Sequence, residues 1–468
     1  MRLARSVSPS SFGPTRTGGG APSASELTPL ILGTILNPLN SSMVSVALLP
    51  IQRDFAISIA TVTWVISAFY LAACVGQPLM GRFADRFGPR RVFLSGMVLV
   101  ALAGVAAPFA PSFAVVVVCR VVQALGTSTA FPSAMTLLRR ERSSTGPAVI
   151  ATANTLGAAL GPVLGGVLVA FGGWEAIFWV NVPLSLLAIA LALTLIRRDP
   201  PTLMGSVASV VRAVDFPGVA TFTCATVGFL VFVLSLSQRV KWWALPPLLL
   251  GSAAFIAWER RAPEPFIDVR RLWSHRKLLA TYGQFIVFNV VYYGAFYGLP
   301  QWLEEARGYS PRTAGLLLLP IAGVGAIATA LTPRMIRRVG IRPTLLTGSA
   351  VLLVGAAGIL TLGQSAGVAL VLGVGVLLGV PYGLYNLGLQ DAMNRQAPRA
   401  LAGVAAGLFQ TSRYIGAIVA TSVIGLTFGS HIGDRQLHNL SYVMIAVTAL
   451  LVVSAVALRR PPAGADVD

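Results

Sequence analysis

The chain has 468 residues, of which 55% are hydrophobic and 11% are charged, with a net charge of +19. Soluble domains carry about 25% charged residues, so this composition excludes a protein that exposes most of its length to water. The charge would suit nucleic acid, but the basic residues fall in short gaps between apolar runs, which argues against that partner. Composition therefore predicts an all-α membrane protein.

The first 26 residues are rich in Ser, Gly, Pro and Arg. Such a segment cannot bury enough apolar surface to fold, so it predicts a disordered cytoplasmic tail. It lacks the apolar core of a signal peptide, and the apolar run from Leu27 can itself direct insertion. A second cytoplasmic tail is expected over 461–468.

Apolar runs of about 20 residues, the length that crosses a bilayer, recur along the rest of the chain. They predict fourteen transmembrane helices. The predicted spans are 27–50, 60–80, 91–109, 111–137, 146–171, 175–196, 216–237, 242–258, 278–303, 311–332, 343–362, 366–390, 400–428 and 438–458.

The charges in the gaps predict the orientation of these helices. Lys and Arg prefer cytoplasmic loops, and 27 of the 35 fall in the tails and alternate gaps of one side. Both termini are therefore expected in the cytoplasm, with the chain in the inner (plasma) membrane. The expected domains are the tail 1–26, a six-helix bundle over 27–198, two linking helices with flanking loops over 199–276, a second six-helix bundle over 277–460 and the tail 461–468.

The gap after the second predicted helix, Gly81–Arg91, reads GRFADRFGPRR. Glycines permit a tight turn and a close backbone approach, and Asp85 can accept hydrogen bonds from a helix N-terminus or an Arg. An ordinary basic loop is the alternative. A related stretch without the acid, Pro333–Arg342, fills the corresponding gap of the second half, and such internal symmetry is typical of transporters.

These motifs carry a family resemblance over about residues 27–460. The first loop is similar to the loop signature of the major facilitator superfamily, and Arg120–Gly126 and Gly157–Gly166 resemble its second motif and its antiporter motif. Ser41–Pro50 with Trp64, and Trp174–Pro183, are similar to the fourteen-helix drug:proton antiporters. The resemblance implies multidrug efflux and antibiotic resistance by alternating access of two bundles, with proton antiport.

Arg120 lies deep in a predicted span, where a charge costs on the order of 3 kcal/mol even on a lenient scale. It must meet a partner or a wet cavity: it either fixes packing through carbonyls, tunes a neighbouring acid or binds an anionic group. Arg413 is similar but nearer the inner half. The expected gating and coupling residues are Gly81, Asp85, Arg86, Gly88, Arg90, Arg120, Gly157, Gly161, Pro162, Gly165 and Gly166.

Three of these glycines, at 157, 161 and 165, fall on one helix face, where small residues let two helices approach closely. Simple packing is the alternative to a seam that closes one face of the transporter. The span 278–303 interleaves aromatics with amides, which suits a cavity for a bulky ligand or, alternatively, packing. The expected substrate-binding residues are Asn37, Asn40, Asn154, Gln284, Phe288, Asn289, Tyr292, Tyr293, Tyr382, Tyr385 and Asn386.

The resemblance fails at one position. The fourteen-helix antiporters resemble one another in an Asp in helix 1, where this chain has Asn40, and an amide does not titrate. A facilitator, or an exporter without proton coupling, is therefore the alternative to an antiporter, and a non-transporting receptor is a remoter one. Sequence motifs of an enzyme, a metal site or an ATP-driven pump are absent, so no catalytic residue, metal or cofactor is expected. The expected partners are a small organic substrate, protons and the lipid bilayer, with the chain as a monomer.

Overall fold

The computed structural model describes residues 24–57, 59–62, 64–141, 145–199, 215–236, 240–263, 265–398, 401–429 and 432–457. Within these ranges the chain forms helices and no strands, as predicted. The two predicted tails lie outside the described residues, except that 24–26 form the first turn of a helix and not part of a disordered tail.

The helices before the linking segment pack against one another. They are α1 (Ala24–Asp54), α2 (Ile59–Val62), α3 (Trp64–Phe87), α4 (Pro89–Ala106), a 3-10 turn η1 (Ala107–Phe109), α5 (Phe113–Thr127), α6 (Ala130–Arg140), α7 (Gly146–Gly172), α8 (Ala176–Trp179) and α9 (Asn181–Leu195).

The later helices form a second group, preceded by the linking pair. The linking segment holds α11 (Phe216–Ser235), a 3-10 turn η2 (Trp242–Ala244) and α12 (Leu245–Glu259). The second group is α13 (Val269–Ser274), α14 (Arg276–Glu305), α15 (Pro311–Leu317), α16 (Leu319–Val339), α17 (Ile341–Ile359), α18 (Val368–Gln396), α19 (Ala402–Phe428) and α20 (Asp434–Ala457).

Each of the fourteen predicted ranges contains helix, but fewer of the helices qualify as membrane spans. In the described part of the chain, ten are long and apolar enough to cross a bilayer, or eleven if α1, which bends by 52°, counts as one span. Helix α12 is only 15 residues long, and α14 interleaves amides and tyrosines with its apolar residues. The count of fourteen is therefore not confirmed.

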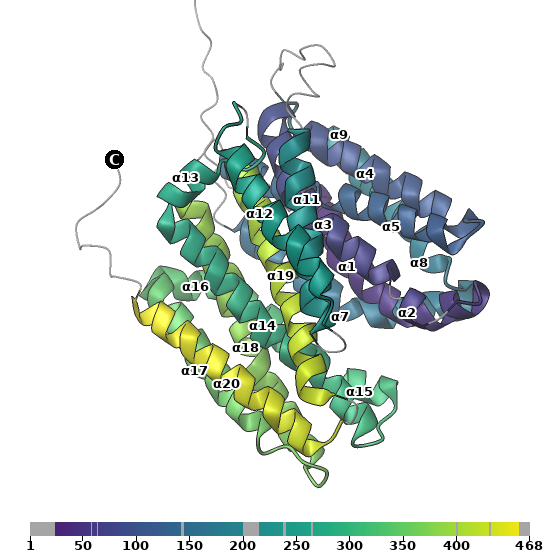
Figure 1. Ribbon diagram of the computed structural model, residues 1–468, viewed down its shortest axis with the longest axis vertical. Helices are drawn as coiled ribbons and strands as arrows, with labels where there is room; N and C mark the ends of the chain where they lie inside the picture. Colours follow the sequence, from purple (N-terminus) through teal and green to yellow (C-terminus); the bar gives the residue numbers. More distant parts are fainter. Residues whose placement is uncertain are drawn as a thin grey trace, which may run out of the picture.

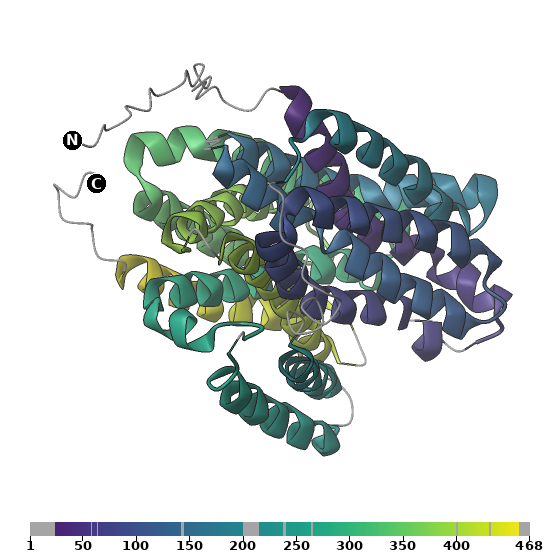
Figure 2. The ribbon, with the colours of Figure 1, turned by 90° about the horizontal axis from the view of Figure 1, so that it is seen from above.

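Figure 1 shows the two groups side by side, purple to blue for the earlier helices and green to yellow for the later ones, with α19 between them. Figure 2 shows the teal pair α11 and α12 against one side of both groups. Leu230 and Val233 of α11 pack with Phe69 of α3 and with Tyr414 and Ile418 of α19. The linking pair thus covers the contact between α3 and α19 from outside.

The two motif segments are helical and not loops, which corrects the prediction. Helix α3 continues to Phe87, and α4 begins at Pro89, so only Gly88 separates them. Gly88 has a φ of 98°, and Gly340 separates α16 from α17 with a φ of 86°. Only glycine adopts this backbone without strain, so the internal repeat is a repeated helix break.

Candidate functional site

Asp85 binds the N-terminus of α19. Its two carboxylate oxygens accept hydrogen bonds from the backbone N–H of Gly403, at 2.8 and 3.0 Å, and one accepts from Val404 at 3.1 Å. Thr136 of α6 donates to the same carboxylate at 3.3 Å. A carboxylate at the positive end of a helix is stabilised by the helix dipole and by otherwise unpaired N–H groups. Asp85 thus joins α3 of the first group to α19 of the second.

Glycines let these two helices touch. A Cβ on Gly81 would lie 2.1 Å from the carbonyl oxygen of Gly403, and one on Gly407 would lie 2.3 Å from that of Gln77. Further along the same contact, the Thr411 hydroxyl donates to the Cys74 carbonyl at 2.9 Å. Any side chain larger than hydrogen at Gly81 would push Gly403 away from Asp85.

One end of the molecule holds the last residues of α3, α6, α9 and α18 and the first residues of α4, α7 and α19. We call it the basic end. Two further contacts join the groups there: Arg139 donates to the Ala397 carbonyl, and Gln390 lies 3.1 Å from the Met135 sulfur. The two groups are therefore in contact at the basic end on both the α3–α19 side and the α6–α18 side.

The rest of the first motif acts within the first group. Arg90 donates to the carbonyls of Ala192 and Leu193 at the end of α9. Asp199 accepts from the Arg91 backbone N–H at 3.0 Å, and a Cβ on Gly88 would overlap its carboxylate. Asp199 also lies 3.6 Å from Arg140. Arg86 is exposed, with its guanidinium 6.0 Å from the ring of Phe87. Asp199 was not predicted as a site residue, because nothing in the neighbouring sequence marks it.

Arg120 is 1% exposed, and its partners belong to the first group. It donates to the carbonyls of Val65 and Asn40, at 3.3 and 3.4 Å, and to the Gln123 side chain at 2.7 Å. Its guanidinium also lies 4.4 Å from the ring centre of Phe69. Of the three predicted roles, these contacts match the fixing of helix packing through carbonyls.

Asn40 links Arg120 to a second buried amide. The Asn40 side chain donates to Asn181 at 2.6 Å and accepts from Gln123 at 3.2 Å. We call Asn40, Arg120, Gln123 and Asn181 the amide network. Asn181, which is fully buried, was not predicted as a site residue, although it interrupts an apolar run. The network contains a charge but no titratable acid.

The predicted glycine face of α7 packs within the first group. Cβ atoms on Gly157, Gly161 and Gly165 would meet Ile35, Ser42 and Met43 of α1, at 2.4, 1.7 and 2.8 Å respectively. A Cβ on Gly166 would meet nothing within 4 Å. The Pro162 side chain lies outside the described part. The face is thus a close α1–α7 contact, which favours the packing alternative in this conformation.

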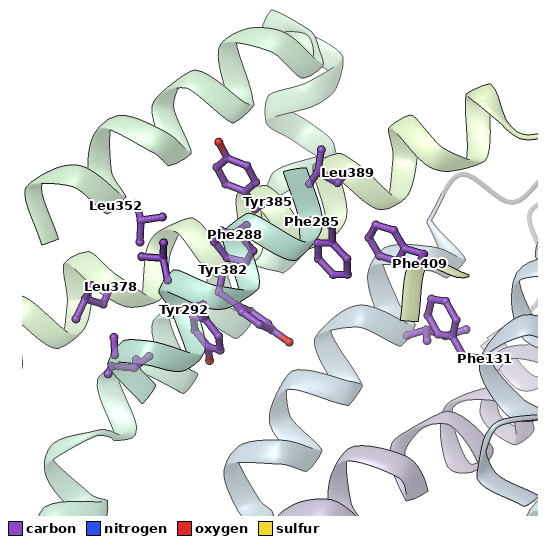
Figure 3. Close-up of a cluster of buried hydrophobic side chains, with 14 of the residues drawn as sticks. Phe131, Phe285, Phe288, Tyr292, Leu352, Leu378, Tyr382, Tyr385, Leu389 and Phe409 are labelled. Atoms are coloured by element: carbon purple, nitrogen blue, oxygen red, sulfur yellow. The ribbon is translucent and has the colours of Figure 1, made fainter. Parts of the chain in front are cut away.

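The predicted aromatic residues Phe288, Tyr292, Tyr382 and Tyr385 are all buried in one hydrophobic cluster, within which their hydroxyls differ in their partners. Phe288 and Tyr385 are stacked with ring centres 4.7 Å apart and are almost fully buried, and the Tyr385 hydroxyl bonds Ser349. Figure 3 shows the hydroxyls of Tyr292 and Tyr382 on the other side of this stack from the Tyr385 hydroxyl. In this conformation Phe288 and Tyr385 pack in the core, which favours the packing alternative, and their role in substrate binding stays a prediction.

Tyr292, Tyr293 and Tyr382 instead gather around Arg413 of α19. The rings of Tyr292 and Tyr382 are 4.4 Å apart, and those of Tyr292 and Tyr293 are 5.3 Å apart. These three tyrosines and Tyr414 lie close enough to Arg413 to interact with its charge. Tyr70 of α3 lies across from them, 5.7 Å from the ring of Tyr414. We call Tyr70, Tyr292, Tyr293, Tyr382, Arg413 and Tyr414 the tyrosine–arginine cluster.

Other predicted polar residues sit around this cluster. Asn386 accepts from Arg413 at 3.0 Å. Asn37 accepts from the Tyr414 hydroxyl at 2.6 Å, a hydrogen bond between the two groups. Asn289 packs under Gly416 and donates to the Phe285 carbonyl.

Two further residues predicted to bind substrate, both with amide side chains, make none of the contacts with the tyrosine–arginine cluster described above. Gln284 is 9% exposed. Asn154 of α7 is buried, and its side-chain oxygen has no hydrogen-bond partner among the described residues. Sequence analysis missed Tyr70 and Tyr414. Each of the two tyrosines places a hydroxyl within an apolar run, and this was the signal by which they could have been found.

A buried carboxyl pair lies in the linking helices at the basic end. Asp215 accepts from Trp258 at 2.7 Å and from the backbone of Phe266 at 2.8 Å, whereas one oxygen of Glu259 has no partner among the described residues. A Cβ on Gly218 would lie 2.4 Å from an Asp215 oxygen and 2.6 Å from that Glu259 oxygen, so the two carboxyls converge. Burial first, and the Asp215 charge second, raise the pKa of Glu259 to about 8.

A cavity of about 390 Å³ connects this region to the Asp85 contact. It is lined by Arg82 and Asp85 of α3, by Val404 of α19 and by Phe266 and Ile267, the two residues whose backbone groups bind the carboxyl pair. The linking segment therefore forms one wall of the space beside the α3–α19 contact. No group of residues that could hold a metal ion occurs in the part of the chain described.

Comparison with known proteins identifies the family. Residues 30–421 match the Major Facilitator Superfamily. A Bacillus subtilis protein named as an uncharacterized MFS-type transporter, YwoD, is 38% identical over 92% of this chain and 96% of its own. The tetracenomycin C resistance and export protein of Streptomyces glaucescens is 30% identical over 87% of this chain and 76% of its own.

A third relative and a solved structure extend this picture. The lincomycin resistance protein of Streptomyces lincolnensis is 29% identical over 91% of this chain and 89% of its own. The crystal structure of the human organic anion transporter MFSD10 aligns with 93% of this chain and all of its own, with a TM-score of 0.64 and 17% identity. At that identity the likeness concerns the fold alone.

Proposed function

Because the chain belongs to the Major Facilitator Superfamily, we propose that this multi-pass membrane transporter exports small organic molecules across the plasma membrane by alternating access. Transporters of this family are not enzymes, in agreement with the sequence analysis. The proposal takes 27–198 and 277–460 as two bundles that move against each other, joined by two linking helices, with fourteen spans and the protein acting as a monomer.

The contact of Asp85 with the N-terminus of α19 is the observation that carries the proposal. It joins the two groups through a few hydrogen bonds and glycine contacts at one end, so it can break without disrupting either group. The bias of Lys and Arg assigns the basic end to the cytoplasm. The conformation described here is then the one closed to the cytoplasm, from which a substrate leaves outward.

The proposed substrate class is based on the names of the relatives. Two of them are named for resistance to the antibiotics tetracenomycin C and lincomycin. We therefore propose drug-like or metabolite molecules as substrates, bound between the two bundles near the tyrosine–arginine cluster.

Proton antiport is the usual means by which such an exporter concentrates its cargo, and it is our first proposal for the driving force. Transport without proton coupling is the alternative, and the amide network favours it. Asn40 occupies the helix 1 position at which the family's antiporters resemble one another in an acid, and its partners Gln123 and Asn181 are amides as well.

Uptake into inverted membrane vesicles tests the function. A panel of fluorescent drugs is offered with and without an imposed pH gradient, in vesicles with and without the protein. Uptake that depends on the protein supports export, and its dependence on the gradient separates the two driving forces. Failure of every compound in vesicles that contain folded protein would refute the proposal.

Reporter fusions test the orientation. A reporter active only outside the cytoplasm should be silent after Pro462 and active near Gly433. The reverse pattern would contradict both the assignment of the basic end and the count of fourteen spans.

A further inference from the structure

The middle of the protein carries a positive charge that no acid of the described helices neutralises. Arg413 is half-buried on α19, about three helical turns from the Asp85 contact. Its one protein hydrogen bond in the described chain is to the Asn386 side chain, and its buried Nε has no partner. Its guanidinium lies 5.7 Å from the ring centre of Phe285.

Arg120 shows what a satisfied arginine looks like in the same protein. Its three donor nitrogens each reach an acceptor, and it is sealed from solvent at 1% exposure. Arg413, by contrast, keeps accessible surface and a spare donor. A guanidinium presents a planar fork of donors that matches a carboxylate, so the spare donor of Arg413 is complementary to an anionic group.

The hydroxyls beside Arg413 are also free to donate. Tyr292, Tyr293 and Tyr382 make ring contacts with one another but no hydrogen bond to the described protein. Figure 3 shows the hydroxyls of Tyr292 and Tyr382 directed away from the Phe288–Tyr385 stack. Three phenol donors and one guanidinium thus surround one position, with aromatic rings on its sides.

Among the described residues, no carboxylate lies beside Arg413 and the three tyrosines. In the described helices every Asp and Glu lies near a helix end, as Asp85, Asp215, Glu259 and Asp391 illustrate. Arg413 takes part in no ion pair within these ranges, whereas the exposed Arg395 is paired with Asp391 at 2.9 Å. A cationic ligand here would meet like charge and no counter-ion.

We propose that Arg413, with the hydroxyls of Tyr292, Tyr293 and Tyr382, binds the carboxylate of an aromatic organic acid, and that the rings of the cluster hold the aromatic body. The inference rests on the proposed transport function, because it assigns the charge and shape of the substrate. The guanidinium fixes the anion, the hydroxyls complete its hydrogen bonds, and the aromatic rings stack on the ligand.

Binding of three probes that share one aromatic body tests this assignment. The probes are anthracene-9-carboxylate, 9-anthracenemethanol and 9-anthracenemethylammonium, titrated by fluorescence anisotropy against purified full-length protein in nanodiscs, with empty nanodiscs as the blank. We expect the carboxylate to bind at least tenfold more tightly than the alcohol, and the ammonium to bind more weakly than the alcohol.

Variants then locate the charge. Arg413→Gln should remove the preference for the carboxylate while the affinity for the alcohol stays within twofold. Arg413→Lys should retain part of the preference, because a point charge replaces the planar fork. Arg395→Gln, which removes one positive charge from an exposed ion pair, is the matched control and should bind as the wild type does.

Two milder variants cover the case in which Arg413→Gln does not fold. Tyr293→Phe and Tyr382→Phe remove only a hydroxyl and should weaken carboxylate binding three- to tenfold without changing alcohol binding. Equal affinities of the wild type for the three probes, or a carboxylate preference that survives both Arg413→Gln and the tyrosine variants, would overturn the inference.

The same probes separate this inference from the proposed function. If vesicles move the alcohol but the carboxylate binds no better, the anion assignment fails and transport stands. If the carboxylate binds through Arg413 but no probe crosses the membrane, the proposed function fails and the site stands.

Discussion

Replacement of Asp85 by Asn tests the contact at the basic end. The amide oxygen can still accept from Gly403, but the amide N–H₂ group would face the Val404 N–H, and the negative charge at the N-terminus of α19 is lost. Hydrogen bonds to a charged group contribute about 1.5–3 kcal/mol. We therefore expect the closed conformation to lose about 2–3 kcal/mol, a shift of about 30- to 150-fold in the equilibrium between conformations.

The protein contains its own reporter of this equilibrium. The Cys74 thiol is fully buried on α3, and the carbonyl of the same residue accepts from Thr411 of α19. Separation of α3 from α19 would expose the thiol. With Cys119 and Cys224 replaced by Ala, a maleimide should label Cys74 at least tenfold faster in Asp85→Asn than in the otherwise identical parent, and transport should fall strongly.

Arg90→Gln is the matched control, because Arg90 belongs to the same motif but binds carbonyls of α9 within the first group. It should leave Cys74 labelling close to that of the parent. Unchanged labelling together with normal transport by well-expressed Asp85→Asn would show that the contact does not hold the closed conformation.

Three further changes give separate tests. Arg120→Ala should lower the melting temperature and abolish transport, because it leaves buried acceptors unpaired, and Arg120→Lys should not fully rescue either; full stability and activity of both would refute its role in the amide network. In liposomes the wild type should concentrate a neutral substrate weakly or not at all on an imposed pH gradient, whereas Asn40→Asp should do so if the missing carboxylate is the coupling element; strong coupling in the wild type would contradict this. The pKa of Glu259 is raised from 4.5 to about 8, so between these pH values the folded protein holds a proton that the unfolded chain has released. The contribution of this group to the free energy of unfolding is therefore complete below pH 4.5 and falls by about 1.4 kcal/mol per pH unit as the pH rises toward about 8. Glu259→Gln should flatten that decline in a thermal melt, and an identical pH profile would contradict the assignment.

The sequence alone predicted the features that depend on local pattern. Apolar runs located the helices. The acid among basic residues in the first motif predicted a helix N-terminus or an Arg as the partner of Asp85, and the hydrogen bonds from Gly403 and Val404 show the first of these. The pattern could not show that this segment is helical. Helix α3 runs through Asp85 because only Gly88 interrupts its backbone, and a single glycine does not reveal its φ in advance.

The other features of the site depend on which residues from distant segments of the chain come into contact. Arg120 and Arg413 both interrupt apolar runs, and no local pattern distinguishes the second as the arginine with a spare donor. The difference arises because Asn40 and Val65 come within reach of Arg120, whereas Asn386 is the one residue of the described chain that accepts a hydrogen bond from Arg413. Tyr385 was likewise indistinguishable from Tyr292 and Tyr382 until the structure showed that its hydroxyl bonds Ser349.

The origin of each side chain in the tyrosine–arginine cluster limits how a ligand could act on the conformation. Arg413 and its partner Asn386 belong to the same helix group, so they stay together when the groups move apart. Tyr70, and Asn37 beside the cluster, belong to the other group and contact Tyr414. A ligand shifts a conformational equilibrium only by its difference in affinity for the two states. An anion held by Arg413 alone would bind both states equally, so any preference between them must come from the part of the ligand that contacts Tyr70, Asn37 and Tyr414, where separation of the groups changes what the ligand meets.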